Sequence, residues 1–138
     1  MSDKIIQTAQ AFLEAWNAHD LPQLLTFYTP DYEAADVSQA TPIRGRDGVE
    51  RVIKAIFDAF PDLSLTSDES IIQGDRVAVA WTMCGTHLGK VMNIPPTRRQ
   101  VQVRGISILT LQDGQIARAL HVWDVAGLLR AIGLLPDL

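Results

Sequence analysis

The sequence has few residues that could cross-link or anchor it. Its 138 residues include one cysteine, Cys84, which excludes an intramolecular disulfide and favours a reducing, cytoplasmic compartment. Cys84 ends an apolar run that starts at Val77, so a buried and unreactive thiol is expected. No run of about 18 apolar residues occurs, and we therefore expect no contact with a membrane interior. The three histidines lack the short spacing of a metal site, so no metal is expected.

The chain also lacks a surplus of positive charge. Its net charge is −4 and its pI about 5.2, whereas a nucleic-acid-binding domain usually shows a basic patch or stripe. Apolar residues make up 47% and charged residues 20% of the chain, which is typical of a globular protein. Residues 1–138 are therefore expected to form a single domain with one core and no nucleic-acid partner.

Helices are expected in the first part of the chain and strands in the second. Apolar residues recur at helical spacing in three segments, at about residues 5–16, 21–28 and 49–60. A weak strand at 32–37 is followed by longer β-rich runs at 63–72, 76–86, 101–111 and 116–123. Asp113-Gly114 is a strong signal for a type I′ hairpin turn, and Asp124 can cap a closing helix over residues 125–132.

This order of elements predicts an α+β fold. A long antiparallel sheet twists and curls, and the N-terminal helices would then pack into its concave side. The molecule would then be cone-shaped, and the space left between the helices and the sheet would be a central pocket.

Several segments resemble proteins of the SnoaL-like polyketide cyclase family, in the nuclear transport factor 2-like superfamily. The similar segments are Trp16 to Leu21 (WNAHDL), Gly85 to Gly89 (GTHLG) with Ile94 to Thr97 (IPPT), Asp113 to Ile116 (DGQI), His121 to Asp124 (HVWD) and Gly127 to Gly133 (GLLRAIG). They extend over nearly the whole chain in the same order. The resemblance implies the cone-shaped α+β fold.

The resemblance also implies a chemistry. The family's polyketide cyclases close a ring by an intramolecular aldol reaction without metal or cofactor. An aspartate on the last strand acts as general acid and base, supported by a histidine on the preceding strand. These two positions correspond here to His121 and Ser107, so the chain departs from the family pattern at both.

His121 is the first candidate for acid–base chemistry, because an imidazole exchanges a proton near neutral pH. Alternation along the strand places Ala117, Ala119 and His121 on one face, and the two alanines leave room for a ligand. Ser107 could hydrogen-bond His121 or act as a small filler.

Two carboxylates are further catalytic candidates. Asp36 could be the partner of His121, or a solvated residue at the end of a strand. Asp124 is placed to cap the last helix and could also orient the imidazole. The superfamily resemblance also leaves open an Asp36–Arg104–Asp124 set of the epoxide-hydrolase type, against which the strand parity of Arg104, opposite to that of Ser107, argues.

The candidate ligand-binding residues are Trp16, Tyr28, His87 and Trp81. Trp16 and Tyr28 are similar in position to pocket walls of the family, and His87 would lie at the pocket mouth or anchor a loop. The two strands at 76–86 and 101–111 are apolar on both faces, which favours a homodimer or a higher homo-oligomer.

Two functions remain open from the sequence. One is a cofactor-independent cyclase, isomerase or lyase that acts on a polyketide-like or other apolar oxygenated ligand. The other is a non-catalytic ligand-binding or protein-interaction domain of the same fold, which the loss of the family's Asp/His pair favours.

Overall fold

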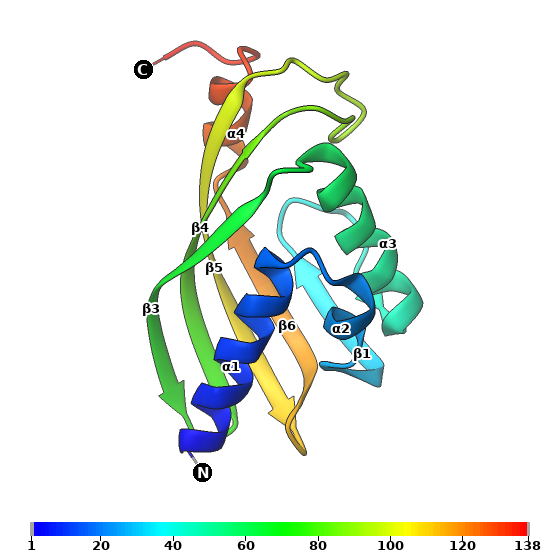
Figure 1. The fold of residues 1–138 in the computed structure, drawn as a ribbon, viewed down its shortest axis with the longest axis vertical. Coiled ribbons are helices and arrows are strands. Elements are labelled where there is room, and N and C mark those ends of the chain that lie inside the picture. The colour runs from blue at the N-terminus through cyan, green and yellow to red at the C-terminus, as the bar shows by residue number, and fades with distance from the viewer. Residues whose placement is uncertain (1, 138) are drawn as a thin grey trace.

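The computed structural model describes residues 2–137. Its element order is α1 (Ser2–Asn17), α2 (Leu21–Leu25), β1 (Tyr28–Asp36), β2 (Ile43–Arg44), α3 (Gly45–Ala59), β3 (Ser64–Gln73), β4 (Arg76–Thr86), β5 (Gln100–Gln112), β6 (Gln115–Trp123) and α4 (Val125–Ala131). The predicted α+β fold is confirmed: the helices lie against one curved sheet that does not close on itself (Figure 1). No helix within residues 2–137 is long and apolar enough to cross a membrane.

The six strands form one sheet in the order β2-β1-β6-β5-β4-β3. Strands β3 to β6 form an antiparallel meander. Strand β1 pairs in parallel with β6 and antiparallel with β2, so the sheet is mixed rather than purely antiparallel. The parallel pair forms because the chain leaves β1, crosses through α3 and the strands β3 to β5, and then returns as β6 beside β1 in the same direction.

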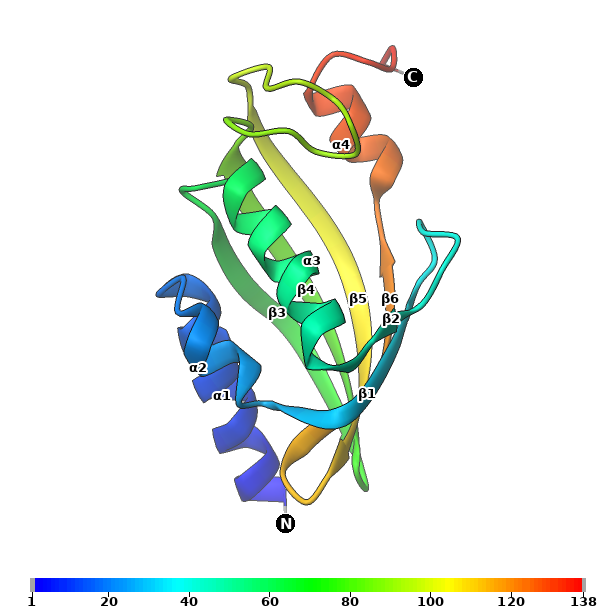
Figure 2. The same cartoon turned by 90° about the vertical axis from the view of Figure 1, so that its right-hand side faces the viewer.

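Helices α1, α2 and α3 lie over one face of the sheet, and α4 lies near its upper end (Figures 1 and 2). We call the face that the helices cover the inner face, and the opposite one the outer face. Two clusters of buried side chains fill the space between the layers. The first surrounds Tyr28, Tyr32 and Ile53, and the second surrounds Phe60, Val103 and Leu128.

The predicted turn signals are confirmed by the backbone. Asp113 has φ of 52° and Gly114 has φ of 80°, the positive values that a type I′ turn needs at both central positions. Asp20 caps α2, with its Oδ1 accepting a hydrogen bond from the Gln23 N–H at 3.1 Å.

The prediction for the segment after α2 is wrong. The helix ends at Leu25, and Tyr28 already belongs to β1, whereas the sequence predicts the apolar pair Phe27-Tyr28 on the buried side of the helix. Pro30 does not end a helix but lies within β1, at an irregularity of the pairing with β6 between Tyr28 and Glu33. Proline is tolerated in a strand at such a position because no ladder hydrogen bond is needed there.

The prediction for Cys84 is also wrong, because this thiol is exposed. Cys84 lies on the outer face of β4, opposite Ser64 of β3 and Gln102 of β5. Alternation along the strand turns Met83 inward and Cys84 outward, and the helical layer covers only the inner face.

Candidate functional site

Three predicted site residues lie side by side on the inner face of the sheet. Asp36 of β1 is the register partner of His121 of β6, and His121 is in turn the register partner of Ser107 of β5. Ser107 is 7% exposed, while Asp36 and His121 are half-buried. The sheet therefore brings together residues that are up to 85 positions apart (121 − 36).

Ser107 joins two of these strands through its hydroxyl. Its Oγ lies 2.7 Å from Nδ1 of His121. The same Oγ accepts a hydrogen bond from the Trp81 indole Nε1–H at 3.0 Å. Of the two alternatives for Ser107, the structure shows the contact with His121, and Trp81 adds a polar contact to the same hydroxyl.

Asp36 is held by donors from Ser38 and from Trp123 of β6. Its Oδ1 accepts from the backbone N–H of Ser38 at 2.8 Å and from the Ser38 hydroxyl at 2.6 Å. The Trp123 indole Nε1–H also reaches both carboxylate oxygens, at 3.1 and 3.2 Å. These contacts orient an acceptor-only carboxylate beside the strand that bears His121.

Burial lowers the pKa of His121 below its ordinary value of 6.5, and the negative charge of Asp36 partly opposes that shift. The larger effect is the loss of hydration, which disfavours the charged imidazolium. His121 is therefore a neutral imidazole around neutral pH, with one ring nitrogen that bears a proton and one that accepts.

A glycine makes room for the two indoles of the site. Gly105 of β5 lies between Trp81 and Trp123 in the register. A Cβ at this position would lie 2.3 Å from Cζ2 of Trp81 and 2.8 Å from Cβ of Trp123. Any larger residue would displace at least one indole, because real Cβ atoms do not approach so closely.

Sequence reasoning missed Gly105 and Trp123. Trp123 has the same strand parity as His121, which was the signal that it shares the inner face. It also missed Tyr32, which is 2% exposed and whose ring lies 4.7 Å from that of Tyr28. Burial raises the pKa of both tyrosines, so their phenol groups stay protonated.

The surroundings of the imidazole are small and apolar. Ala119 is 7% and Ala34 2% exposed, and the two are register partners one step along the inner face. Ala117, expected on the same face, is the extra residue of a β-bulge between Ile116 and Arg118, and Ile116 takes the buried position in its place.

Asp124 is exposed and its capping role is confirmed. Its Oδ1 accepts from the Gly127 N–H at 2.8 Å, which satisfies a free donor in the first turn of α4. Within residues 2–137 no hydrogen bond joins Asp124 to His121. Arg104 is exposed and has the parity of the outer face, so the Asp36–Arg104–Asp124 set is not assembled.

Trp16 and Tyr28 pack in the core among aromatic rings. The ring centroids of Trp16 and Phe57 lie 5.5 Å apart, and those of Tyr28 and Phe12 lie 5.9 Å apart. Tyr28 is 4% exposed. Both rings therefore contact other aromatic side chains of the core.

His87 is fully buried and anchors a loop. The Thr97 N–H donates to its Nδ1 at 3.2 Å, and the Thr97 Oγ1 lies 2.9 Å from the same atom. Backbone hydrogen bonds between His87 and residues Arg98 and Arg99 close this loop. The structure therefore shows the loop-anchoring alternative, and the expected place at a pocket mouth is wrong because the side chain is 0% exposed.

Two cavities lie outside the row of Asp36, His121 and Ser107. One of about 460 Å³ is an open groove at the end of β3, β4 and β5, lined by Asp62, Ser64, Cys84, Gly85, Thr86, Gln100, Val101 and Gln102. The other, of about 20 Å³, is apolar and lies between α1 and the sheet. Within residues 2–137 no three His, Cys, Asp or Glu side chains are close enough to hold a metal ion.

Solved structures with the same fold extend over the whole chain. A candidate hydroxylase, AclR from Streptomyces galilaeus, is 28% identical with a TM-score of 0.87, covering 100% of this chain and 85% of its own. TsrD from Streptomyces laurentii is 29% identical with a TM-score of 0.88, covering 98% of both chains.

A third structure is IdmH from Streptomyces antibioticus, a candidate polyketide cyclase. It is 27% identical with a TM-score of 0.80, covering 94% of this chain and 98% of its own. No curated protein sequence matches the chain. The sequence profile of the SnoaL-like polyketide cyclases matches residues 6–132, and the chain belongs to this family.

Proposed function

We propose that the chain is a cofactor-independent acid–base enzyme, a cyclase, isomerase or lyase that acts on a polyketide-like or other apolar oxygenated ligand. The observation that carries this proposal is the 2.7 Å contact between Ser107 Oγ and His121 Nδ1. It lies on the inner face, with Asp36 beside the imidazole. An imidazole that is oriented by one nitrogen presents the other to a ligand.

The roles follow from the contacts. His121 exchanges or shares a proton with the ligand, and Ser107 orients its ring. Asp36 supplies a fixed negative charge that stabilises the imidazolium when a proton arrives. The small side chains of Ala34 and Ala119 lie one step along the inner face from the imidazole. IdmH, a candidate polyketide cyclase, supports a ring-closing reaction as the first one to test.

The experiment compares turnover by the wild type and His121→Ala on a panel of poly-β-keto substrates. Loss of a general acid or base lowers the rate on the order of 10²–10⁴-fold, and we expect such a fall in a variant that still folds. Leu134→Ala is the matched control, because Leu134 is exposed and lies outside the sheet. Undiminished turnover by His121→Ala would exclude the proposed role.

A non-catalytic binding or interaction domain is the second candidate. The observation that favours it is the position of the 460 Å³ groove, which is lined by other residues than His121. Under this function the wild type turns over no member of the panel, and ligands that bind do so equally well to His121→Ala.

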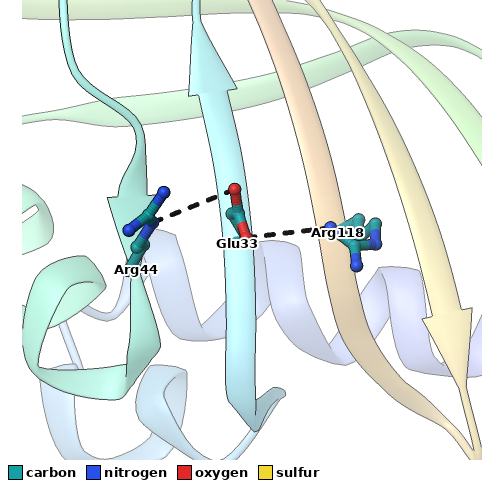
Figure 3. A network of polar contacts seen from close by, with 3 residues as sticks. All are labelled: Glu33, Arg44 and Arg118. Carbon is teal, nitrogen blue, oxygen red and sulfur yellow. Dashed lines mark ion pairs between the residues drawn. The ribbon is translucent and has the colours of Figure 1, made fainter.

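We further propose a homodimer that pairs the outer faces of two sheets. Four large apolar side chains are exposed there, Ile71 at 62%, Ile106 at 52%, Val122 at 47% and Leu120 at 38%. A monomer seldom exposes so many neighbouring apolar groups. Beside them Glu33 lies 3.9 Å from both Arg44 and Arg118 (Figure 3), as in the charged rim of an interface.

Sedimentation of the wild type and of Ile106→Glu tests the homodimer. We expect a dimer for the wild type and a monomer for the variant, because a buried charge without a partner destabilises the interface. Leu134→Glu, at an exposed apolar residue outside the sheet, is the control and should remain a dimer. A monomeric wild type would refute the proposal.

The exposed thiol of Cys84 agrees with the reducing cytoplasm as the proposed compartment.

A further inference from the structure

A chain of hydrogen bonds runs from Trp81 through Ser107 to His121, and its direction can be worked out. The indole Nε1–H of Trp81 can only donate, so Ser107 Oγ accepts at this 3.0 Å contact. A serine hydroxyl has one hydrogen of its own. Within residues 2–137 the remaining partner of Ser107 Oγ is Nδ1 of His121, at 2.7 Å.

Only one tautomer of His121 satisfies every group in this chain. If Nδ1 carried the proton, Ser107 would accept twice and its own hydrogen would have no acceptor. Ser107 is 7% exposed, and leaving a buried donor unsatisfied costs free energy. If Ser107 donates to Nδ1 instead, every donor in the chain is used and the ring proton lies on Nε2.

The Nε2 atom of His121 is not fully buried. Within residues 2–137 it makes no hydrogen bond, and the fully buried polar side-chain atoms without a partner are Thr29 Oγ1 and His87 Nε2. Nε2 of His121 is not among them, so it reaches accessible space.

We infer that Trp81 is a positioning residue that acts through Ser107 to fix His121 as the Nε2–H tautomer, so that the ring offers a hydrogen-bond donor to an acceptor oxygen of the ligand, such as a carbonyl oxygen. This inference rests on the proposed function, since it assigns the direction of the contact at the same imidazole. A neutral N–H aimed at a carbonyl stabilises the negative charge that develops on its oxygen.

The structure also shows why Trp81 is held in place. The benzo edge of its indole lies over Gly105, where a Cβ would approach Cζ2 to 2.3 Å and Cη2 to 2.7 Å. The absence of a side chain at Gly105 allows the indole to cross to Ser107, which is two residues further along β5.

The test is ¹⁵N NMR of histidine-labelled protein without substrate, at about pH 8, where imidazoles are neutral. In the wild type we expect the Nε2–H tautomer at His121. Trp81→Phe keeps an aromatic ring but removes the donor, so Ser107 becomes free to accept from Nδ1. The ratio of Nε2–H to Nδ1–H should then fall by about fivefold or more, as it should in Ser107→Ala.

Trp123→Phe is the matched control, because it removes an indole donor from Asp36 rather than from Ser107. It should leave the tautomer of His121 unchanged. His19 and His87 report the fold of each variant. The Leu63 carbonyl accepts from Nε2 of His19 and the Thr97 N–H donates to Nδ1 of His87, so both should stay Nε2–H throughout.

An Nδ1–H tautomer at His121 in the wild type would overturn the inference, since Nε2 would then offer a lone pair to the ligand. An unchanged ratio in both Trp81→Phe and Ser107→Ala would overturn it as well. These outcomes concern the resting protein and are independent of turnover, whereas failure of the proposed function appears as full activity of His121→Ala.

Discussion

Replacing Gly105 by alanine is expected to destabilise the protein by about 2–4 kcal/mol. The new methyl group would lie 2.3 Å from Trp81 Cζ2 and 2.8 Å from Trp123 Cβ. Trp123 Cβ is tied to its backbone and cannot move away, so the strand or the indole of Trp81 must shift. Overpacking of this kind costs about 1–3 kcal/mol. Losing the Trp81–Ser107 hydrogen bond adds about 1 kcal/mol.

Urea denaturation, followed by circular dichroism at one protein concentration, measures the effect. With a slope of about 2 kcal/mol/M, the midpoint should fall by about 1–2 M. Gly48→Ala is the matched control. Gly48 lies in helix α3, and its Cβ would meet Cγ2 of Ile43 in β2 at 3.4 Å, an ordinary van der Waals contact. Alanine there is expected to stabilise by about 0.5–1 kcal/mol. Equal midpoints for Gly105→Ala and the wild type would show that the indoles are not confined as described.

Two further predictions concern the pH dependence of stability and a helix cap. Burial gives His121 a lower pKa in the folded than in the unfolded chain, so its contribution to stability is present above about pH 6.5 and is lost as the pH falls through the folded-state pKa. The free energy of unfolding of the wild type should therefore drop more steeply than that of His121→Gln below about pH 6.5, and equal slopes would contradict the shift. Asp124→Ala removes the acceptor for the Gly127 N–H and should cost about 1 kcal/mol. The melting temperature should fall accordingly, and an unchanged value would mean that solvent replaces the cap.

Much of the architecture could be predicted because the local patterns are strong. The stripe of apolar residues in α1 and α3 indicated both helices, and Asp113-Gly114 indicated the last hairpin. The segment at Phe27-Tyr28 could not be assigned correctly, because two adjacent apolar residues fit the end of a helix as well as the start of a strand. The start of the strand at Tyr28 depended on β6, because Tyr28 pairs there with Ile116. Strand β2 has two residues, too few to form a pattern.

Within the site, the sequence indicated the residue types and the tertiary structure determined their partners. His121 stood out because an imidazole among alanines suits proton transfer, and Ser107 because of the family resemblance. For Asp36 the sequence left two interpretations open, a partner of His121 or a solvated residue at the end of a strand. Its place beside His121 depends on the parallel pairing of β1 with β6. Nothing local to Trp81 or Trp123 indicates which carboxylate or hydroxyl each indole reaches.

The sequence by itself determined the alternation of inward and outward side chains, the positions of most turns and the family of the fold, since these depend on neighbouring residues. Only the tertiary structure decided the register of the site. A regular two-residue hairpin at Asp113-Gly114 would place His121 opposite Ile106, whose side chain lies on the outer face. The β-bulge at Ala117 shifts the pairing by one residue and brings Ser107 opposite His121, because one extra residue in a strand exchanges the two faces beyond it.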